Sequence, residues 1–263
     1  MTIDQAAEPA AAAGSREPRG TAVVLGVGPG LGLSIARRFG RGGHPVAVVS
    51  RSSARHEDYL SRLRADGTTA IAEAADVRDR DQVADVLARI EQQLGPVEAL
   101  YYGPAGMDPA DFPVPIEATT GAALNATFTL VTSAADAVGA VLPGMLERGR
   151  GVILLPTGLS AIRPMPELGH LAPIGAALRN YTLTLNAAVA DRGVFAGSIV
   201  IGGGVRGGDI YAAMASNAEQ LAAVGLDADQ LAARSLDPDA MADQIWDLTV
   251  ARDRAELVFS VLD

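Results

Sequence analysis

A glycine-rich stretch near the amino terminus has the residue types and spacing of a phosphate-binding loop. It reads Gly26-Val27-Gly28-Pro29-Gly30-Leu31-Gly32 and joins a short apolar run, residues 21–26, to a segment with amphipathic helical spacing, residues 30–42. A pyrophosphate binds the backbone N–H groups at a helix amino terminus, where side chains would block its approach. We expect Gly26 to allow the tight turn, Gly30 to admit the phosphates and Gly32 to let helix and strand pack closely. Gly28 and Leu31 complete the predicted loop.

The alternative is a glycine-rich turn without a ligand, but the strand–turn–helix context favours a dinucleotide. Ser50 and Arg51 follow the second apolar run, residues 46–49. An acid at this point binds a ribose 2′-hydroxyl and repels a 2′-phosphate, whereas an arginine can pair with that phosphate. Ser50 and Arg51 therefore favour NADP(H) over NAD(H). The alternative for Arg51 is a solvated side chain at the start of a helix.

Strand-like and helical segments alternate along the chain and provide the scaffold for these residues. Apolar runs predict the strands, and amphipathic spacing predicts the helices between them. The expected strands are residues 21–26, 46–49, 69–74, 97–102, 152–155, 195–201 and 257–259, and the expected helices are residues 30–42, 54–66, 79–94, 118–148, 172–191 and 228–252. The alternation predicts an α/β fold: a Rossmann-like, doubly wound parallel sheet of about seven strands in a single domain. That domain spans residues 21–263 and follows a disordered tail, residues 1–20.

The glycine loop and the order of elements resemble the short-chain dehydrogenase/reductase family over about residues 21 to 259. The family's loop is Thr-Gly-x-x-x-Gly-x-Gly, and here Leu25 stands in place of the threonine. The resemblance implies a nicotinamide-dependent oxidoreductase. It places Asp76 and Val77 beside the adenine ring, although Asp76 could instead cap the following helix. It also places Gly103 and Gly202 near the nicotinamide and a substrate lid at about residues 203–226.

The family's catalytic set is Asn, Ser, Tyr and Lys, and this chain departs from it. Asn125 matches the asparagine and Thr157 takes the serine position, while His170 and Ile174 stand where Tyr-x-x-x-Lys is expected. An imidazole can exchange protons near neutral pH without help from lysine. We expect a helix to begin near residue 171 with His170 at its cap and Glu167 orienting the ring. The alternatives are a structural cap for His170 and an amide without a special role for Asn125.

Tyr102 is a further candidate because it ends the fourth predicted strand. Side chains at the carboxyl edge of such a sheet meet the ligand. Its phenol could contact substrate or transfer a proton, or it could be a packing residue. Arg163 and Arg206 could meet an anionic substrate, although solvated surface arginines are the commoner case.

The composition excludes several kinds of chemistry. The chain has no lysine and no cysteine, so it has no Schiff base, Walker A lysine, thiol nucleophile, disulfide or cysteine-bound metal. Its three histidines lie far apart in sequence, and we expect no metal site. The net charge of −10 argues against a nucleic-acid partner. We see no targeting or membrane segment and expect a cytoplasmic protein.

Three functions remain open. The first is an NADP(H)-dependent oxidoreductase with a degenerate catalytic tetrad, acting on a carbonyl, alcohol or enone of a small, partly apolar metabolite. The second is a non-redox enzyme on the same scaffold, such as a cyclase, dehydratase or isomerase of secondary metabolism. The third is a catalytically silent NADP(H)-binding protein. The resemblance also implies a homodimer or homotetramer formed through the helices at 118–148 and 172–191.

Overall fold

The apolar runs of the sequence pair side by side in one parallel sheet, which confirms the predicted Rossmann-like fold. The computed structural model describes residues 19–104, 113–217 and 227–262. The strand order across the sheet is β3-β2-β1-β4-β5-β6-β9, and every pairing is parallel. The strands are β1 (Thr21–Leu25), β2 (Val46–Ser50), β3 (Ala70–Ala74), β4 (Val97–Tyr102), β5 (Gly151–Gly158), β6 (Val194–Gly202) and β9 (Glu256–Ser260).

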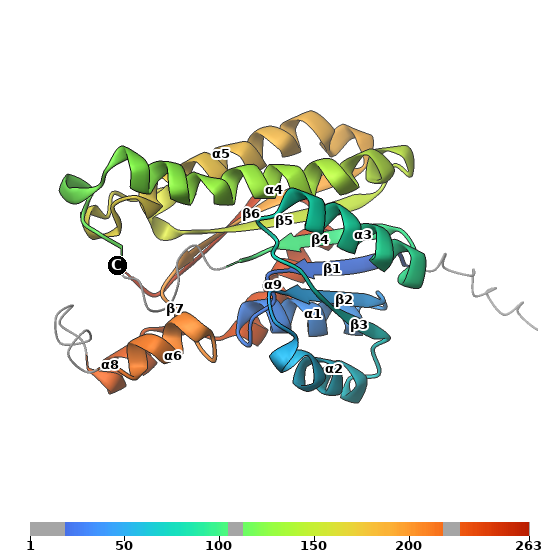
Figure 1. Cartoon of the computed structure of the whole chain (residues 1–263), viewed down its shortest axis with the longest axis horizontal. Coiled ribbons are helices and arrows are strands. Elements are labelled where there is room, and N and C mark those ends of the chain that lie inside the picture. Colours follow the sequence, from blue (N-terminus) through green and yellow to red (C-terminus); the bar gives the residue numbers. More distant parts are fainter. Residues whose placement is uncertain (1–18, 105–112, 218–226, 263) are drawn as a thin grey trace, which may run out of the picture.

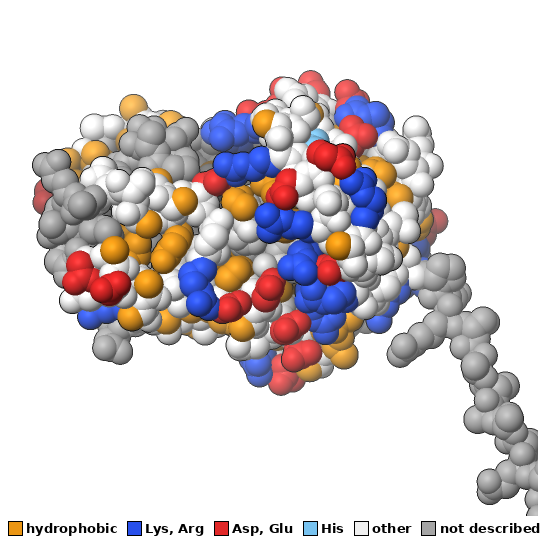
Figure 2. All heavy atoms as spheres, turned by 90° about the horizontal axis from the view of Figure 1, so that it is seen from below, with side chains coloured by type: hydrophobic (Ala, Val, Ile, Leu, Met, Phe, Trp, Pro, Cys, Tyr) orange, Lys and Arg blue, Asp and Glu red, His pale blue; other side chains and the backbone are white. Residues whose placement is uncertain are grey.

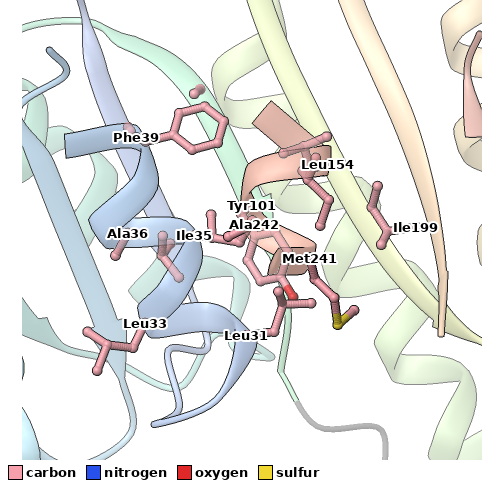
Figure 3. Packing of buried hydrophobic residues seen from close by; sticks show 14 of the residues in the cluster. Leu31, Leu33, Ile35, Ala36, Phe39, Tyr101, Leu154, Ile199, Met241 and Ala242 are labelled. Carbon is pink, nitrogen blue, oxygen red and sulfur yellow. The ribbon is translucent and has the colours of Figure 1, made fainter. Parts of the chain in front are cut away.

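Helices cover both faces of this sheet (Figure 1). One layer holds α1 (Leu31–Arg41), α2 (His56–Ala65) and α9 (Pro238–Ala251), and the other holds α3 (Arg80–Leu94), α4 (Gly121–Glu147) and α5 (Leu171–Val189). Each layer buries its own apolar cluster against the strands, as Figure 3 shows for α1 and α9. Buried apolar surface of this kind is the main stabilising contribution in such a domain.

Short elements connect the main ones. Among them, α6 (Asp209–Ala215) and α8 (Ala228–Ala233) stand apart from the two helical layers in Figure 1. The single-turn helices are η1 (Ser53–Arg55), η2 (Ile116–Ala118), η3 (Leu159–Ala161), η4 (Pro166–Leu168) and η5 (Ala190–Arg192). Of the predicted lid at residues 203–226, residues 218–226 lie outside the described part of the chain.

The predicted helix over residues 228–252 is wrong as a single element. The chain forms α8, then the short strand β8 (Ser235–Leu236), and only then α9; β8 pairs with β7 (Gly204–Val205). The reason is the Asp237-Pro238 step. The Asp237 carboxylate accepts hydrogen bonds from the backbone N–H groups of Asp239 and Ala240. Proline lacks an N–H and suits the first turn of a helix but not its interior, so α9 begins here.

The folded domain begins slightly earlier than the sequence predicts. Gly20 is buried, and its N–H donates to Glu98 Oε2 at 2.8 Å. The His44 ring lies 2.7 Å from the Gly20 carbonyl through Nδ1, and its burial lowers its pKa. The Arg19 guanidinium lies 5.2 Å from the centre of the Trp246 ring. Arg19 and Gly20 therefore belong to the domain, while residues 1–18 of the predicted tail lie outside the described residues.

Helix α4 is long and apolar. Among the described helices it alone has the length and composition to cross a membrane, a criterion that core helices of water-soluble proteins also meet. Its buried side chains pack on the sheet beside α3 and α5. The amino-terminal part of α4 is largely exposed, and the Phe128 side chain there is 43% exposed.

Candidate functional site

Most of the sequence-predicted site residues lie at one edge of the sheet. The sheet order reverses between β1 and β4, and ligands of open α/β sheets bind at the carboxyl ends of strands beside such a reversal. Gly26, Gly103 and Gly202 end or follow β1, β4 and β6, and Thr157 lies at the end of β5. The loops after β1 and β4 are joined directly, since the Gly103 N–H donates to the Leu25 carbonyl at 2.9 Å.

The turn after β1 requires glycine at its first position. Gly26 has φ +78°, and a Cβ placed there would lie 2.5 Å from the Pro104 nitrogen. The N–H groups of Gly26 and Val27 both lie 2.9 Å from the Val49 carbonyl oxygen, which fixes the loop to β2. At Gly32 a Cβ would lie 3.3 Å from Val27 Cα, a close approach of α1 to the loop like the one the sequence predicts. The buried Leu31 begins α1.

The remaining glycines of this loop, Gly28 and Gly30, face Gly208 and Asp209, which lie shortly after β7. A Cβ on Gly30 would lie 2.9 Å from Gly208 Cα. Around Gly28 the space is open, and the nearest atom to such a Cβ is Asp209 Oδ2 at 3.9 Å. The amino terminus of α1 therefore faces the residues just after β7. The first turn of α1 has no acidic residue, and the positive end of its dipole favours an anion there.

Ser50 lies in a small polar network at the end of β2. Its hydroxyl donates to the Ser52 carbonyl at 2.9 Å, and His56 Nε2 lies 2.9 Å from the same hydroxyl oxygen. Because that hydroxyl has one hydrogen, the His56 ring donates to it through Nε2–H. Burial lowers the pKa of His56, which favours the neutral ring. Sequence reasoning missed His56, since a lone histidine six residues after Ser50 matches no pattern.

Arg51 and Asp76 lie near each other at the ends of β2 and β3. Arg51 is exposed. The pKa of Asp76 is lowered mainly by the Arg78 backbone N–H, which donates to its carboxylate at 3.0 Å, with smaller contributions from the Arg78 and Arg51 guanidinium groups. Asp76 does not cap α3: that role belongs to Asp79, whose carboxylate accepts from the N–H groups of Asp81 and Gln82. The capping alternative for Asp76 is wrong by three residues.

Tyr102 does not reach the site, so its predicted contact with substrate is wrong. Its side chain is 2% exposed, and its hydroxyl donates to the Val77 carbonyl at 3.4 Å. Burial raises the pKa of Tyr102 to about 12. Successive side chains of a strand point to opposite faces, and helices cover both faces of β4. Tyr102 therefore packs in the α3–α4 layer, as Tyr101 does in the α1–α9 layer, where Figure 3 labels it.

Two glycines assigned to the nicotinamide also have packing roles. A Cβ on Gly103 would lie 2.2 Å from the Tyr101 ring. A Cβ on Gly202 would lie 2.8 Å from Ser260 Oγ and 3.1 Å from Leu159 Cβ. Neighbouring side chains thus explain both glycines without a ligand.

Thr157 lies beside the first turns of α5. Strand β5 is longer than predicted and carries Thr157 on the same face as Leu155, toward α4 and α5. A Cβ on Gly175 of α5 would lie 2.7 Å from Thr157 Oγ1, so that glycine gives the hydroxyl its room. The half-buried Thr157 hydroxyl is therefore held between the end of β5 and the start of α5.

His170 occupies the cap of α5, at the place the sequence predicts. It makes no side-chain capping hydrogen bond, and its Nδ1 atom is buried without a hydrogen-bond partner among the described residues. Glu167 is exposed, and no hydrogen bond joins it to His170 Nδ1, so its predicted orienting role is wrong. Gly169 has no room for a side chain, because its Cβ would lie 1.9 Å from the Val114 carbonyl oxygen.

The remaining two positions of the expected catalytic set contrast with each other. Ile174, which stands where the sequence resemblance expects a lysine, is buried at 4% exposure. Asn125 is exposed on the second turn of α4. No group of three or more His, Asp or Glu side chains within the described ranges is arranged to hold a metal ion.

Comparison with known proteins gives the class. The family model of short chain dehydrogenases matches residues 20–218. A short chain dehydrogenase of Pseudocercospora fijiensis is 28% identical over 181 residues, which are 66% of this chain and 56% of the relative. The 2,3-dihydro-2,3-dihydroxybenzoate dehydrogenase of Bacillus subtilis is 28% identical over 171 residues, 65% of this chain and 64% of the relative. The match thus spans less than two thirds of either relative.

Solved structures show the same fold. A metagenomic short-chain oxidoreductase in complex with NADP has a TM-score of 0.69 at 18% identity, covering 91% of this chain and 96% of that one. An NAD+-bound xylitol dehydrogenase has a TM-score of 0.76 at 17% identity, covering 94% and 100%. The family match extends over most of the chain, and the protein belongs to the short-chain dehydrogenase family of oxidoreductases.

Proposed function

We propose that this protein transfers hydride between NADP(H) and a carbonyl, alcohol or enone of a small, partly apolar metabolite, with a catalytic set that lacks the family's Tyr and Lys. The observation that carries the proposal is the loop after β1. It combines a glycine-only turn at Gly26, open space before Gly28 and a helix amino terminus without acidic residues. These features fit a pyrophosphate.

The preference for the phosphorylated cofactor rests on the end of β2. No carboxylate stands directly after that strand, and the Arg51 side chain is exposed to solvent. Its guanidinium can make charge-assisted hydrogen bonds to a 2′-phosphate. The NADP-bound relative shares the fold at 18% identity, as does the NAD+-bound one, so the preference depends on Arg51 and not on these likenesses.

The Gly26–Gly32 loop would hold NADP(H), which would supply or accept the hydride when bound. The Thr157 hydroxyl hydrogen-bonds the substrate oxygen from the end of β5. His170 provides or removes the proton at that oxygen. The Nδ1 atom of His170, which is buried without a partner among the described residues, supports this role, because such an atom is costly and a ligand atom can satisfy it.

A second candidate is a silent NADP(H)-binding protein or a non-redox enzyme of the same fold. Two observations favour it: Ile174 is apolar and buried where the family has lysine, and Asn125 is exposed. In the non-redox case, His170 would act as an acid–base residue alone.

Isotope transfer separates these candidates. The protein is incubated with a panel of aldehydes, ketones and enones and with NADPH that carries deuterium at the transferable position. The products are examined by mass spectrometry. Our proposal predicts deuterium on carbon in at least one reduced product, at a rate that falls in His170→Ala. Conversion without deuterium transfer supports the non-redox enzyme, and binding without any conversion supports the silent protein.

We also propose that the protein is a homodimer or homotetramer assembled through α4 and α5. These helices pack against each other at the outside of one layer, and α4 exposes Phe128. Light scattering coupled to gel filtration tests this, with Phe128→Arg expected to shift the mass toward the monomer. An unchanged mass in this variant would contradict the proposed interface.

A further inference from the structure

A four-residue segment lies across the entrance to the phosphate loop. We call this segment, Arg206–Asp209, the strap. Its first end is anchored by the pairing of β7 with β8, where the Arg206 N–H donates to the Leu236 carbonyl at 3.0 Å. The Arg206 side chain also pairs with the Asp237 carboxylate at 2.6 Å. The strap is therefore fixed to the start of α9 at this end.

The second end of the strap is held by an ion pair of long sequence separation. Both carboxylate oxygens of Asp209 accept from Arg55 Nη1, at 2.9 and 2.8 Å. Arg55 lies at the end of η1, directly before α2, on the same side as Arg51 and Ser50. The Asp209 carboxylate raises the pKa of Arg55 above its already high value. This pair ties the residues after β7 to those after β2.

Between its two ends the strap contacts the glycine loop. Gly208 Cα occupies the space in which a Gly30 side chain would lie, and Asp209 Oδ2 is the nearest atom in front of Gly28. The strap thus places a carboxylate where the amino terminus of α1 favours an anion. Asp209 sits where a pyrophosphate would approach, and Arg55 is the cation that it neutralises.

The strap has the room and the backbone freedom to move. Gly207 has φ +74°, a conformation that favours glycine, and Gly208 follows it. An open surface hollow of about 330 Å³ lies beside the strap, and Pro29, Arg206, Gly207 and Asp237 are among its lining residues. Figure 2 shows the face below the sheet, where blue and red side chains alternate, consistent with several arginine–carboxylate pairs rather than one sign of charge.

We propose that Arg55 and Asp209 form a latch that holds the strap over the glycine loop in the cofactor-free protein, and that a dinucleotide binds by displacing Asp209 from Arg55. This inference rests on the proposed function, because it takes the ligand to be a dinucleotide. Asp209 competes with the phosphates for Arg55 and repels them. The latch therefore weakens the binding of both phosphorylated and unphosphorylated nicotinamide cofactors.

The test uses Asp209→Asn, which removes the charge and keeps the shape. The matched control is Asp58→Asn, which makes the same charge change in an exposed pair, Asp58 with Arg62 on α2. Hydrogen exchange of residues 205–217 is measured in the free proteins, and calorimetry measures NADPH and NADH binding. An exposed ion pair contributes modestly, so we expect roughly two- to fivefold tighter binding of both cofactors in Asp209→Asn. Exchange of the strap rises in this variant, and Asp58→Asn changes neither quantity.

The charge reversal Arg55→Asp with Asp209→Arg checks that the pair itself is responsible. It restores the protection of residues 205–217 toward that of the unmodified protein. Unchanged exchange and unchanged cofactor affinity in Asp209→Asn overturn the latch while leaving the proposed function intact. If neither the unmodified protein nor Asp209→Asn binds any nicotinamide dinucleotide, the proposed function fails, and the latch fails with it.

Discussion

The loop after β1 and the segment from the end of β5 to the start of α5 carry the two halves of the candidate site, and they are held in different ways. In the first, backbone hydrogen bonds from Gly26 and Val27 to Val49, and steric contacts around Gly26, determine the geometry. In the second, His170 has no side-chain capping bond, and Thr157 is only half-buried. The scaffold is therefore specified closely where a cofactor would bind, and more loosely where a substrate would react.

This contrast indicates which part of the site tolerates a change of residue type. A loop made of backbone groups depends on glycine at particular positions and accepts little change. A reacting centre made of side chains can change residue types while the strands and helices around it stay the same. That difference fits our expectation from the sequence of a chain with the family's glycine loop and with His170 and Ile174 where Tyr and Lys are expected.

The largest effect is expected from Gly26→Ala. The new Cβ would meet the Pro104 nitrogen at 2.5 Å in a backbone conformation with φ +78°. Strain and overpacking together lower the free energy of unfolding by about 3 kcal/mol. Gly67→Ala is the control, because Gly67 has φ +74° and open space around it, so only about 1 kcal/mol is lost. Urea unfolding measures both, and equal losses would contradict the steric argument.

The second effect concerns the half of the site between the end of β5 and the start of α5, where a substrate would react. His170→Ala lowers kcat for carbonyl reduction by about a hundredfold if the ring exchanges the proton. Tyr102→Phe is the contrast: its hydroxyl is buried in the α3–α4 layer, so kcat stays near that of the unmodified protein and only about 1 kcal/mol of stability is lost. Steady-state kinetics on a substrate found by the isotope experiment measures both. A reversed order of the two variants would overturn the assignment.

The third effect sharpens the cofactor half. Arg51→Gln weakens NADPH binding by roughly tenfold and leaves NADH binding unchanged, because only the 2′-phosphate loses a charged partner. Arg64→Gln is the control, since Arg64 is an exposed arginine of α2 that pairs with Glu57. Calorimetric titration measures the four affinities. Equal loss for NADPH and NADH would show that Arg51 contributes general charge and not selectivity.

The smallest effect concerns how α1 is fixed behind the loop. Arg37 of α1 pairs with Asp66 at 2.7 Å, and this pair lowers the pKa of Asp66. A lowered carboxyl pKa stabilises the fold above the unfolded-state pKa, and that stability is lost as the pH falls through the folded-state pKa. Asp66→Asn therefore costs about 1 kcal/mol at neutral pH, and the difference shrinks as the solution becomes acid.

The control for this prediction is Asp243→Asn. Its carboxylate pairs with Arg38 at 2.8 Å but is 60% exposed, whereas that of Asp66 is 17% exposed. Exposed pairs are screened by solvent, so a smaller loss is expected. Chemical unfolding at neutral and acid pH compares the two variants. A loss in Asp66→Asn that stays constant with pH would contradict the linkage.

The sequence predicts the sheet and the main helices because their signals are local: apolar runs, helical spacing and glycine turns. It fails where long-range packing decides. Tyr102 ends a strand like a ligand-contacting residue, but the covering of both sheet faces buries it. The break at Asp237-Pro238 is readable in hindsight, since Asp before Pro is a helix-start signal. The Arg55–Asp209 contact joins residues that are 154 positions apart, so no local sequence pattern predicts it.

The most direct test of the account is calorimetric titration of the full chain with NADPH, NADP+, NADH and NAD+. We predict micromolar binding with preference for the two phosphorylated forms, and loss of that preference in Arg51→Gln. Absence of binding for all four would contradict the assignment of the Gly26–Gly32 loop to a nicotinamide cofactor.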